Sequence, residues 1–144
     1  MKMSTKGRYG LKSMFELALN EGNENPLPLK IIAEKNGLSE LYLEQIFATL
    51  RKAGLVRSIR GAQGGYYLAR ASDEITVGEI LRALEGPIVP SECVIEDRDV
   101  CERSDFCATK AVWQKIKDSI DQVIDSWTLG DMLREHHIEG QSNQ

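Results

Sequence analysis

Residues 39–67 constrain the fold of this chain most, because the spacing of their apolar side chains changes from a helical to a strand-like period. The first part places apolar residues at i, i+3, i+4 and i+7, namely Leu43, Ile46, Phe47 and Leu50. Gly54 ends that pattern. The segments LVRSIR and YYLAR then alternate on either side of the turn-forming sequence GAQGG. The stretch predicts a helix over residues 40–53, capped by Ser39, and then a β-hairpin.

A shorter helical pattern, LKIIAEKNG, lies directly upstream and completes a helix-turn-helix. Pro28 suits its first position and Gly37 its end, and we expect Ile31, Ile32 and Leu38 to be buried. A bare helix-turn-helix resembles any pair of antiparallel helices, but a hairpin that follows directly is typical of a winged helix. The expected fold class is therefore mainly α: a winged helix-turn-helix with a two-stranded wing and a long C-terminal dimerisation helix.

A winged helix predicts contacts with double-stranded DNA. The start of the second helix enters the major groove, where Glu44 can accept a hydrogen bond from cytosine and Gln45 can pair with adenine. Tyr42 can reach a phosphate or a thymine methyl group. Arg57 and Arg60 on the hairpin can contact phosphates or a narrow minor groove.

Two further groups complete the predicted DNA-binding surface. Basic residues near the start of the first helix suit phosphate, although a solvated basic end is the alternative. Glycines at the hairpin tip let the backbone approach the duplex. The whole set is Lys6, Arg8, Ser39, Leu41, Tyr42, Glu44, Gln45, Arg51, Arg57, Arg60, Gly61, Gly64 and Gly65. The rival interpretation, a nucleotide-phosphate loop, lacks the G-x-x-x-x-G-K-S/T pattern and a surrounding βαβ unit.

The charge distribution agrees with a polyanion partner for the first half of the chain. Residues 1–70 hold 11 Lys and Arg against 6 Asp and Glu, whereas residues 71–144 hold 7 against 16. The net charge of −4 thus hides a basic half of +5 and an acidic half of −9. Chance clustering on solvated faces is the alternative.

Composition and motifs exclude several other classes. No apolar run approaches the roughly 20 residues of a membrane span, and the basic N-terminus lacks the apolar core of a signal peptide. We therefore expect no membrane association and a cytoplasmic location. No Ser/His/Asp or Cys/His arrangement is evident, and His136 and His137 lie near a polar tail, so enzymatic activity is not expected.

The remaining segments predict further helices. The first helix spans about residues 5–21, and Thr76 to Glu79 is a capping-box start for a helix that ends before Gly86. A helix over about residues 109–127 carries a heptad-like seam: Trp113, Ile116, Ile120, Val123 and Trp127. We interpret the seam as a homodimer interface; packing against the chain's own core is the alternative.

The expected organisation has four parts along the chain. They are a DNA-binding domain (1–86), a cysteine-containing loop (87–108), a dimerisation helix with a short capped helix after it (109–137), and a mobile tail (138–144).

Three cysteines lie in the loop, and their number and spacing leave several roles open. Cys93, Cys101 and Cys107 are separated by seven and five residues, which fits neither a zinc ribbon nor a thioredoxin motif. An odd number in a reducing compartment favours metal binding or redox chemistry over a disulfide framework. An iron–sulfur cluster, structural zinc, thiol redox sensing and no role all remain open from spacing alone.

Several motifs together resemble the IscR-type (Rrf-two) family of winged-helix transcription regulators. They are STKGRYGL at 4–11, LSELYLEQIF at 38–47, LRKAGLVRSIRGAQGGYYL at 50–68, and a three-cysteine loop before a long helix. The resemblance covers nearly the whole chain. It implies a homodimer on a palindrome-like operator, with Ser39, Leu41, Tyr42, Glu44 and Gln45 at the major groove and Arg60 at the minor groove.

The resemblance also implies that the three cysteines ligate an iron–sulfur cluster, most often a 2Fe–2S cluster. Cluster-binding members usually separate their cysteines by five and five residues, and the IscR pattern has a histidine where this chain has Lys110. A nitric-oxide-sensing branch uses an acid where this chain has Arg8. The fourth ligand is therefore open, with Asp99, Glu102, Asp105 or a partner-chain residue as candidates. The EGPI sequence at 85–88 is similar to the CymR-type cysteine-metabolism repressors, which lack the cysteines.

These observations lead to a DNA-binding regulator, expected to be a repressor, controlled by an iron–sulfur cluster and acting on iron–sulfur biogenesis or stress genes. The alternative is a thiol-based or partner-controlled repressor of cysteine and sulfur metabolism without a cluster. A protein-interaction module that binds no DNA would leave the basic half of the chain unexplained.

Overall fold

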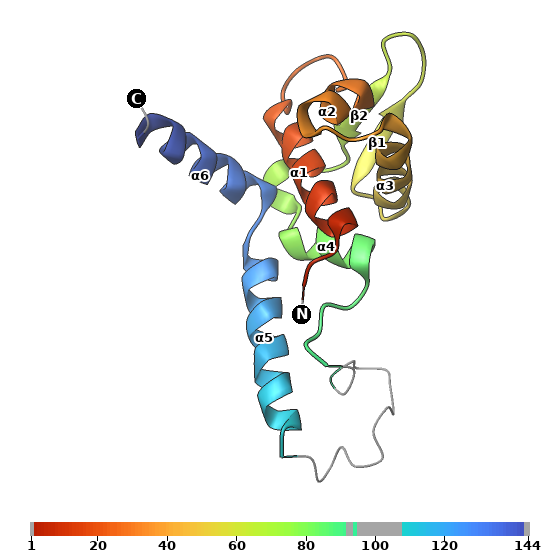
Figure 1. The fold of residues 1–144 in the computed structure, drawn as a ribbon. Helices are drawn as coiled ribbons and strands as arrows, with labels where there is room; N and C mark the ends of the chain where they lie inside the picture. Colours follow the sequence, from red (N-terminus) through yellow and green to blue (C-terminus); the bar gives the residue numbers. More distant parts are fainter. Residues whose placement is uncertain (1, 92–93, 95–107, 143–144) are drawn as a thin grey trace.

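The computed structural model describes residues 2–91, 94 and 108–142. Within them it forms six α-helices, one 3-10 helix and one two-stranded antiparallel sheet (Figure 1). The elements run α1 (Thr5–Leu19), α2 (Leu29–Asn36), α3 (Glu40–Lys52), β1 (Val56–Ile59), β2 (Gly65–Leu68), η1 (Ser72–Glu74), α4 (Val77–Glu85), α5 (Lys110–Ser126) and α6 (Leu129–Ser142). This order confirms the mainly α winged-helix fold expected from the sequence.

Local sequence sets the limits of the helix-turn-helix and of α4. Pro28 is the N-cap of α2, and Gly37 follows the helix in the left-handed region at φ 64°. The Ser39 side chain accepts a hydrogen bond from the Tyr42 N–H at 3.1 Å and so caps α3. Thr76 and Glu79 form the expected reciprocal capping box at the start of α4.

The wing is a two-stranded hairpin, and one residue from outside it, Leu27, pairs with the free edge of β2. Val56 pairs with Leu68 and Ser58 with Tyr66 across β1 and β2. Leu27 then exchanges two backbone hydrogen bonds with Tyr66, at 3.1 and 2.9 Å. The loop before α2 therefore holds β2 in place, a long-range pairing that the sequence pattern did not reveal.

One hydrophobic core joins α1, α2, α3, α4 and the wing. Its fully buried side chains are Met14, Ile32, Leu43, Ile46, Phe47, Leu50, Ile75, Ile80 and Leu129. The Phe47 ring lies 4.7 Å from that of Tyr66, which joins α3 to the wing. Ile31 was expected in the core but is 41% exposed, and Leu29 is buried instead. The buried stripe of α2 runs through Leu29, Ile32 and Ala33, and Ile31 points away from it.

The two C-terminal helices lie largely outside this core (Figure 1). Helix α5 has no buried residue, whereas α6 places Leu129 in the core and packs Met132 and Leu133 against it. Helix α6 continues to Ser142, beyond residue 137, where the sequence was expected to leave helical structure. Polarity predicts exposure rather than loss of helix, and Glu and Gln are good helix formers. No described helix is both long and apolar enough to cross a membrane.

Candidate DNA-binding surface

The exposed face of α3 carries the side chains predicted to meet base edges. Leu43, Ile46, Phe47 and Leu50 are buried, as their spacing indicated. That burial leaves Leu41, Glu44 and Gln45 facing solvent, and Leu41 is 68% exposed. Tyr42 is half-buried against the core, so only part of its ring is free for a contact outside the domain.

A depression of about 530 Å³ lies between α3 and the wing, and residues of α2, α3, β1 and β2 line it. Six of the predicted DNA-binding residues line it: Glu44, Arg51, Arg60, Gly61, Gly64 and Gly65. Lys30 from the start of α2 and Ser58 from β1 line it as well. The fold thus brings together helix and wing residues as far apart in the sequence as Lys30 and Gly65, which are separated by 35 positions.

The cations of this depression are available to an anionic partner. Lys30, Arg51 and Arg60 are exposed, and none forms an ion pair or hydrogen bond with any residue the structure describes. Lys30 also lies at the N-terminus of α2, where unpaired N–H groups favour phosphate. Lys30 was not predicted from the sequence. Its position in the first turn of the first helix of the motif is the signal that would have identified it.

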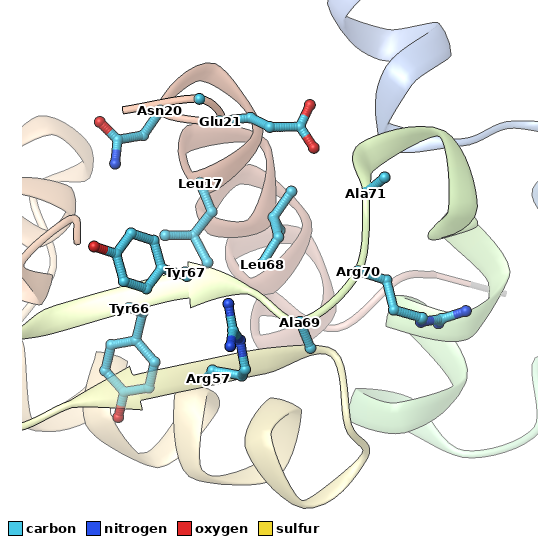
Figure 2. Close-up of a pocket in the computed structure, with 11 residues that line it drawn as sticks. Leu17, Asn20, Glu21, Arg57, Tyr66, Tyr67, Leu68, Ala69, Arg70 and Ala71 are labelled. Atoms are coloured by element: carbon cyan, nitrogen blue, oxygen red, sulfur yellow. The ribbon is translucent and has the colours of Figure 1, made fainter. Parts of the chain in front are cut away.

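Arg57 and Arg60 lie on different sides of the wing. Side chains alternate along a strand, and the Arg57–Tyr67 pair faces away from the side that carries Val56, Ser58 and Tyr66. Arg57 lines a second hollow of about 320 Å³, between the end of α1 and β2. Figure 2 shows the residues that line this hollow. Arg57 is therefore separated from the depression beside α3, although the sequence grouped the two arginines.

At two positions of the wing, a side chain larger than that of glycine would clash with the chain's own backbone. A Cβ atom at Gly65 would lie 2.5 Å from the Leu27 carbonyl oxygen, and one at Gly64 would lie 2.3 Å from the Ile59 oxygen. Gly61 has open space around it but adopts φ +117°, which side chains rarely allow. The hairpin therefore needs these glycines to close its turn, whether or not DNA approaches it.

Lys6 and Arg8 lie on the first turns of α1 and do not line the depression. The start of α1 is instead tied to the end of α4. The Ser4 backbone N–H and hydroxyl both donate to one carboxylate oxygen of Glu85. A Cβ at Gly7 would meet the same oxygen, so a glycine there permits the contact. Arg8 is exposed, whereas Lys6 is half-buried.

Helix α5 has two different long faces. Ile116, Ile120 and Val123 line an apolar groove together with Met3. At about 100° per residue, the opposite face carries Asp121 and Asp125, whose carboxylates contact α4.

The apolar seam thus lies apart from the α5 face that contacts α4, and of the chain's own winged domain only Met3 lines its groove. Its exposed members include Ile116 at 37%, Val123 at 58% and Trp127 at 40%, and Trp113 is half-buried. The alternative that the seam packs into the chain's own core does not fit this arrangement.

Cys93, Cys101 and Cys107 lie outside the described residues, as do Asp99, Glu102 and Asp105. Among the residues that are described, no group of three or more His, Cys, Asp and Glu side chains is placed to hold a metal ion. Lys110 is the first residue of α5.

The fold and the surface define a winged helix-turn-helix of the DNA-binding type. The profile of the Rrf2 family, described as an iron-dependent transcriptional regulator, matches residues 3–135. The chain therefore belongs to the Rrf2 family. It is a transcriptional regulator that binds DNA, and not an enzyme.

Two kinds of relative in this family resemble the chain. The transcriptional regulator CymR of Bacillus subtilis is 53% identical over 132 residues, covering 92% of this chain and 89% of that protein. Its solved structure, described as the global cysteine regulator, superposes with a TM-score of 0.75. The solved structure of IscR from T. potens is 52% identical with a TM-score of 0.76, covering 94% of this chain and 88% of that one. IscR of Cronobacter sakazakii is 36% identical over 138 residues, covering 96% of this chain and 83% of that protein.

Proposed function

We propose that this chain acts in the cytoplasm as a homodimer that represses transcription by binding a two-half-site DNA operator. The observation that carries the proposal is the depression between α3 and the wing, where three cations without a partner among the described residues flank the exposed face of a recognition helix. Helix α3 would present Leu41, Glu44 and Gln45 to base edges in the major groove.

The cations and helix α3 would contact different parts of the DNA. Lys30, Arg51 and Arg60 border the face of α3 and would contact phosphates on either side of it, which fixes its register without reading sequence. Arg60 has a second option, since a wing that follows the backbone places its arginine at the minor groove. Arg57, on the other side of the wing, would contribute less.

The homodimer rests on the apolar seam of α5. The chain's own domain leaves Ile116 and Val123 exposed to water unless a second copy covers them. Two α5 helices packed through this face would present two α3 helices, as a palindromic operator requires.

The first candidate for control is an iron–sulfur cluster held by Cys93, Cys101 and Cys107. The donor set fits in part, because thiolates are the ligands that such clusters prefer, but three cysteines supply three of the four ligands that a cluster takes. Lys110 at the start of α5 is a poor fourth ligand, since a protonated ammonium has no lone pair. A bound cluster would make the regulator responsive to iron–sulfur supply or to oxidants.

The second candidate is control without a cluster, on genes of cysteine or sulfur metabolism. It is supported by the 53% identity with CymR, whose solved structure is described as that of a global cysteine regulator, while the 52% identity with the solved IscR supports the first candidate to a similar degree. In this case the three thiols would sense oxidants directly or take no part, and a partner protein would carry the signal.

Operator binding is tested with a matched pair of arginine variants. Arg60→Ala should weaken operator binding by roughly 1–3 kcal/mol, measured by fluorescence anisotropy at fixed ionic strength. Arg57→Ala, with the same charge change on the same hairpin, should cost less than about 0.5 kcal/mol because it faces away from α3. Equal losses for the two variants, or none for Arg60→Ala at low salt, would contradict the proposed orientation of the wing.

The two forms of control are separated by anaerobic purification. A cluster predicts visible charge-transfer absorption, with iron and sulfide in stoichiometric amounts, and their loss in a Cys93→Ser, Cys101→Ser, Cys107→Ser triple variant. A colourless, iron-free protein that still binds its operator, and loses that binding on thiol oxidation, would establish the cluster-free form instead.

A further inference from the structure

The junction between the winged domain and α5 depends on one arginine. Arg82, in the last turn of α4, donates from Nη1 and Nη2 to the two carboxylate oxygens of Asp125, at 2.6 and 2.9 Å. Its Nη2 also donates to Asp121 at 3.0 Å. Lys117 binds the other oxygen of Asp121 at 2.7 Å. A single guanidinium thus joins two successive turns of α5 to α4.

The pKa values of the group reflect this pairing. Hydrogen bonds to Asp125, and then to Asp121, outweigh burial and raise the pKa of Arg82 above its ordinary value. Burial acts to raise the pKa of Asp121, but hydrogen bonds from Lys117 and Arg82 outweigh it and leave the pKa below its ordinary value. Both groups are therefore held in their charged forms.

The other attachment of α5 lies at its C-terminal end. The Val77 N–H donates to the Trp127 carbonyl at 2.8 Å, and the Leu129 N–H donates to the Ile75 carbonyl at 3.0 Å. These backbone contacts fix the end of the helix at one point. Attachment at one end does not determine the direction of the α5 axis. The contact of Arg82 with Asp121 fixes the helix at a second position, about 10 Å from Trp127 along the axis.

The direction of α5 has large consequences at its far end. Lys110 lies roughly 25 Å from the Trp127 attachment along the helix axis. A tilt of about 10° would therefore move that end by about 4 Å, more than the roughly 3.4 Å rise of one base pair. Because α5 has no buried residue, its apolar contact with its own domain is limited to partly exposed side chains such as those beside Met3.

We propose that Arg82 is a positioning residue that sets the distance and rotation between the two recognition helices, and so the half-site spacing that the dimer accepts. This inference rests on the proposed function, because it requires a dimer through α5 and an operator with two half-sites. Arg82 does not line the depression beside α3 and touches no DNA in this scheme. It acts by holding α5, whose opposite face carries the seam.

A substitution at Gly78 would disturb the same junction between α4 and α5 by a different route. A Cβ atom there would lie 2.2 Å from an Asp125 carboxylate oxygen and 2.8 Å from Nη1 of Arg82. Gly78→Ala therefore displaces the ion pair while leaving every charge in the protein unchanged. Gly78 is the second residue of α4, and a Gly→Ala change within a helix favours helix formation, so this variant is expected to fold.

The test uses an operator that the wild-type protein itself selects from a randomised duplex library. Duplexes are then made with one or two base pairs inserted or removed between the half-sites, together with a duplex that carries one half-site. Affinities are measured for the wild type, Arg82→Gln, Gly78→Ala, and a charge-balanced double variant with Arg82→Gln and Asp125→Asn. Arg70→Gln is the matched control: it removes a similarly exposed ion pair, with Glu79 of α4 at 2.7 Å, that does not reach α5.

The wild type and Arg70→Gln should lose at least about tenfold in affinity when the spacing changes by two base pairs, since the two half-sites then no longer fit one rigid dimer. The three junction variants should lose less than about threefold, while binding the single half-site within about twofold of the wild type. A merely stabilising role for Arg82 would lower the melting temperature and leave the spacing profile unchanged. A wild-type-like spacing profile in any folded junction variant overturns the inference. A wild-type protein that selects no duplex overturns the proposed function itself.

Discussion

The winged domain and helix α5 are held in place by different kinds of interaction. In the domain, Phe47, Leu43 and Ile46 are completely buried and contact side chains from other elements. Helix α5 is as long as any other helix of the described residues, yet none of its residues is buried. It is attached by the Arg82 cluster and by backbone hydrogen bonds beside Trp127.

The difference shows which part of the chain is complete on its own. An interior of close-packed side chains determines one arrangement, because a shift of one residue leaves gaps or clashes around it. A helix joined by partly exposed ion pairs is held more weakly, and its apolar face still needs a partner. We therefore expect the winged domain to set the stability of the fold, and α5 to set its assembly.

The largest effect should follow a cavity in the winged domain. Phe47→Ala removes a completely buried ring that packs on Tyr66, and it should lower the free energy of unfolding by about 3–5 kcal/mol. Urea unfolding followed by far-UV circular dichroism measures the change. A loss below about 1 kcal/mol would mean that this core does not dominate stability.

Assembly should respond most to a charge in the α5 groove. Val123→Asp places a carboxylate at an exposed position of the seam and should weaken dimerisation at least 100-fold, about 2.7 kcal/mol. Sedimentation velocity over a concentration series measures this. Gln122→Asp introduces the same side chain at the neighbouring position, outside the groove, and should leave the dimer intact. Similar dissociation in both variants would place the interface elsewhere.

Alanine substitutions at two glycines, Gly65 and Gly140, compare a closely packed position with an open one. Gly65→Ala would place a Cβ atom 2.5 Å from the Leu27 carbonyl oxygen, so we expect a loss of about 1–3 kcal/mol of stability as the wing shifts. At Gly140 in α6, an added Cβ atom would meet no atom of the described residues within 4 Å. Gly140→Ala should therefore be neutral or stabilise by up to about 1 kcal/mol. Thermal unfolding of the two variants compares them directly, and the reverse order would contradict the packing described for the wing.

The smallest effect concerns the ion cluster and depends on pH. The pKa of Asp121 is lower in the folded chain than its ordinary value of 3.8, so its ionised form favours the folded state. That contribution is present above pH 3.8 and is lost as the pH falls through the lower folded-state value. Asp121→Asn should therefore cost up to about 1 kcal/mol at neutral pH and nothing in acid.

The control for this measurement is Asp118→Asn on the same helix, whose carboxylate accepts a hydrogen bond from Gln114. Unfolding free energies of both variants and the wild type are compared from neutral pH into acid. A cost of Asp121→Asn that is independent of pH would show that the side chain acts through packing and not through its charge.

Much of the candidate DNA-binding surface could be expected from the sequence because its signals are local. The cap at Ser39, the buried spacing from Leu43 to Leu50 and the turn at Gly61 each involve residues a few positions apart. Such interactions are encoded in short segments, and they correctly placed Leu41, Glu44 and Gln45 on an exposed helix face. Lys30 was missed although its signal was local too, because the start of α2 was interpreted through its apolar residues alone.

The amino-acid sequence was sufficient to predict most of the elements and the side chains exposed on each one, since hydrophobic period and capping depend on near neighbours. How the elements meet was settled by tertiary packing. It joined Leu27 to Tyr66, separated Arg57 from Arg60, placed Leu129 in the core, and paired Arg82 with Asp121 and Asp125. Arg82 and Asp125 are 43 positions apart, and no local period relates them. Their contact exists because α4 and α5 are brought side by side, and on the proposed mechanism that contact distinguishes a rigid dimer from two loosely joined domains.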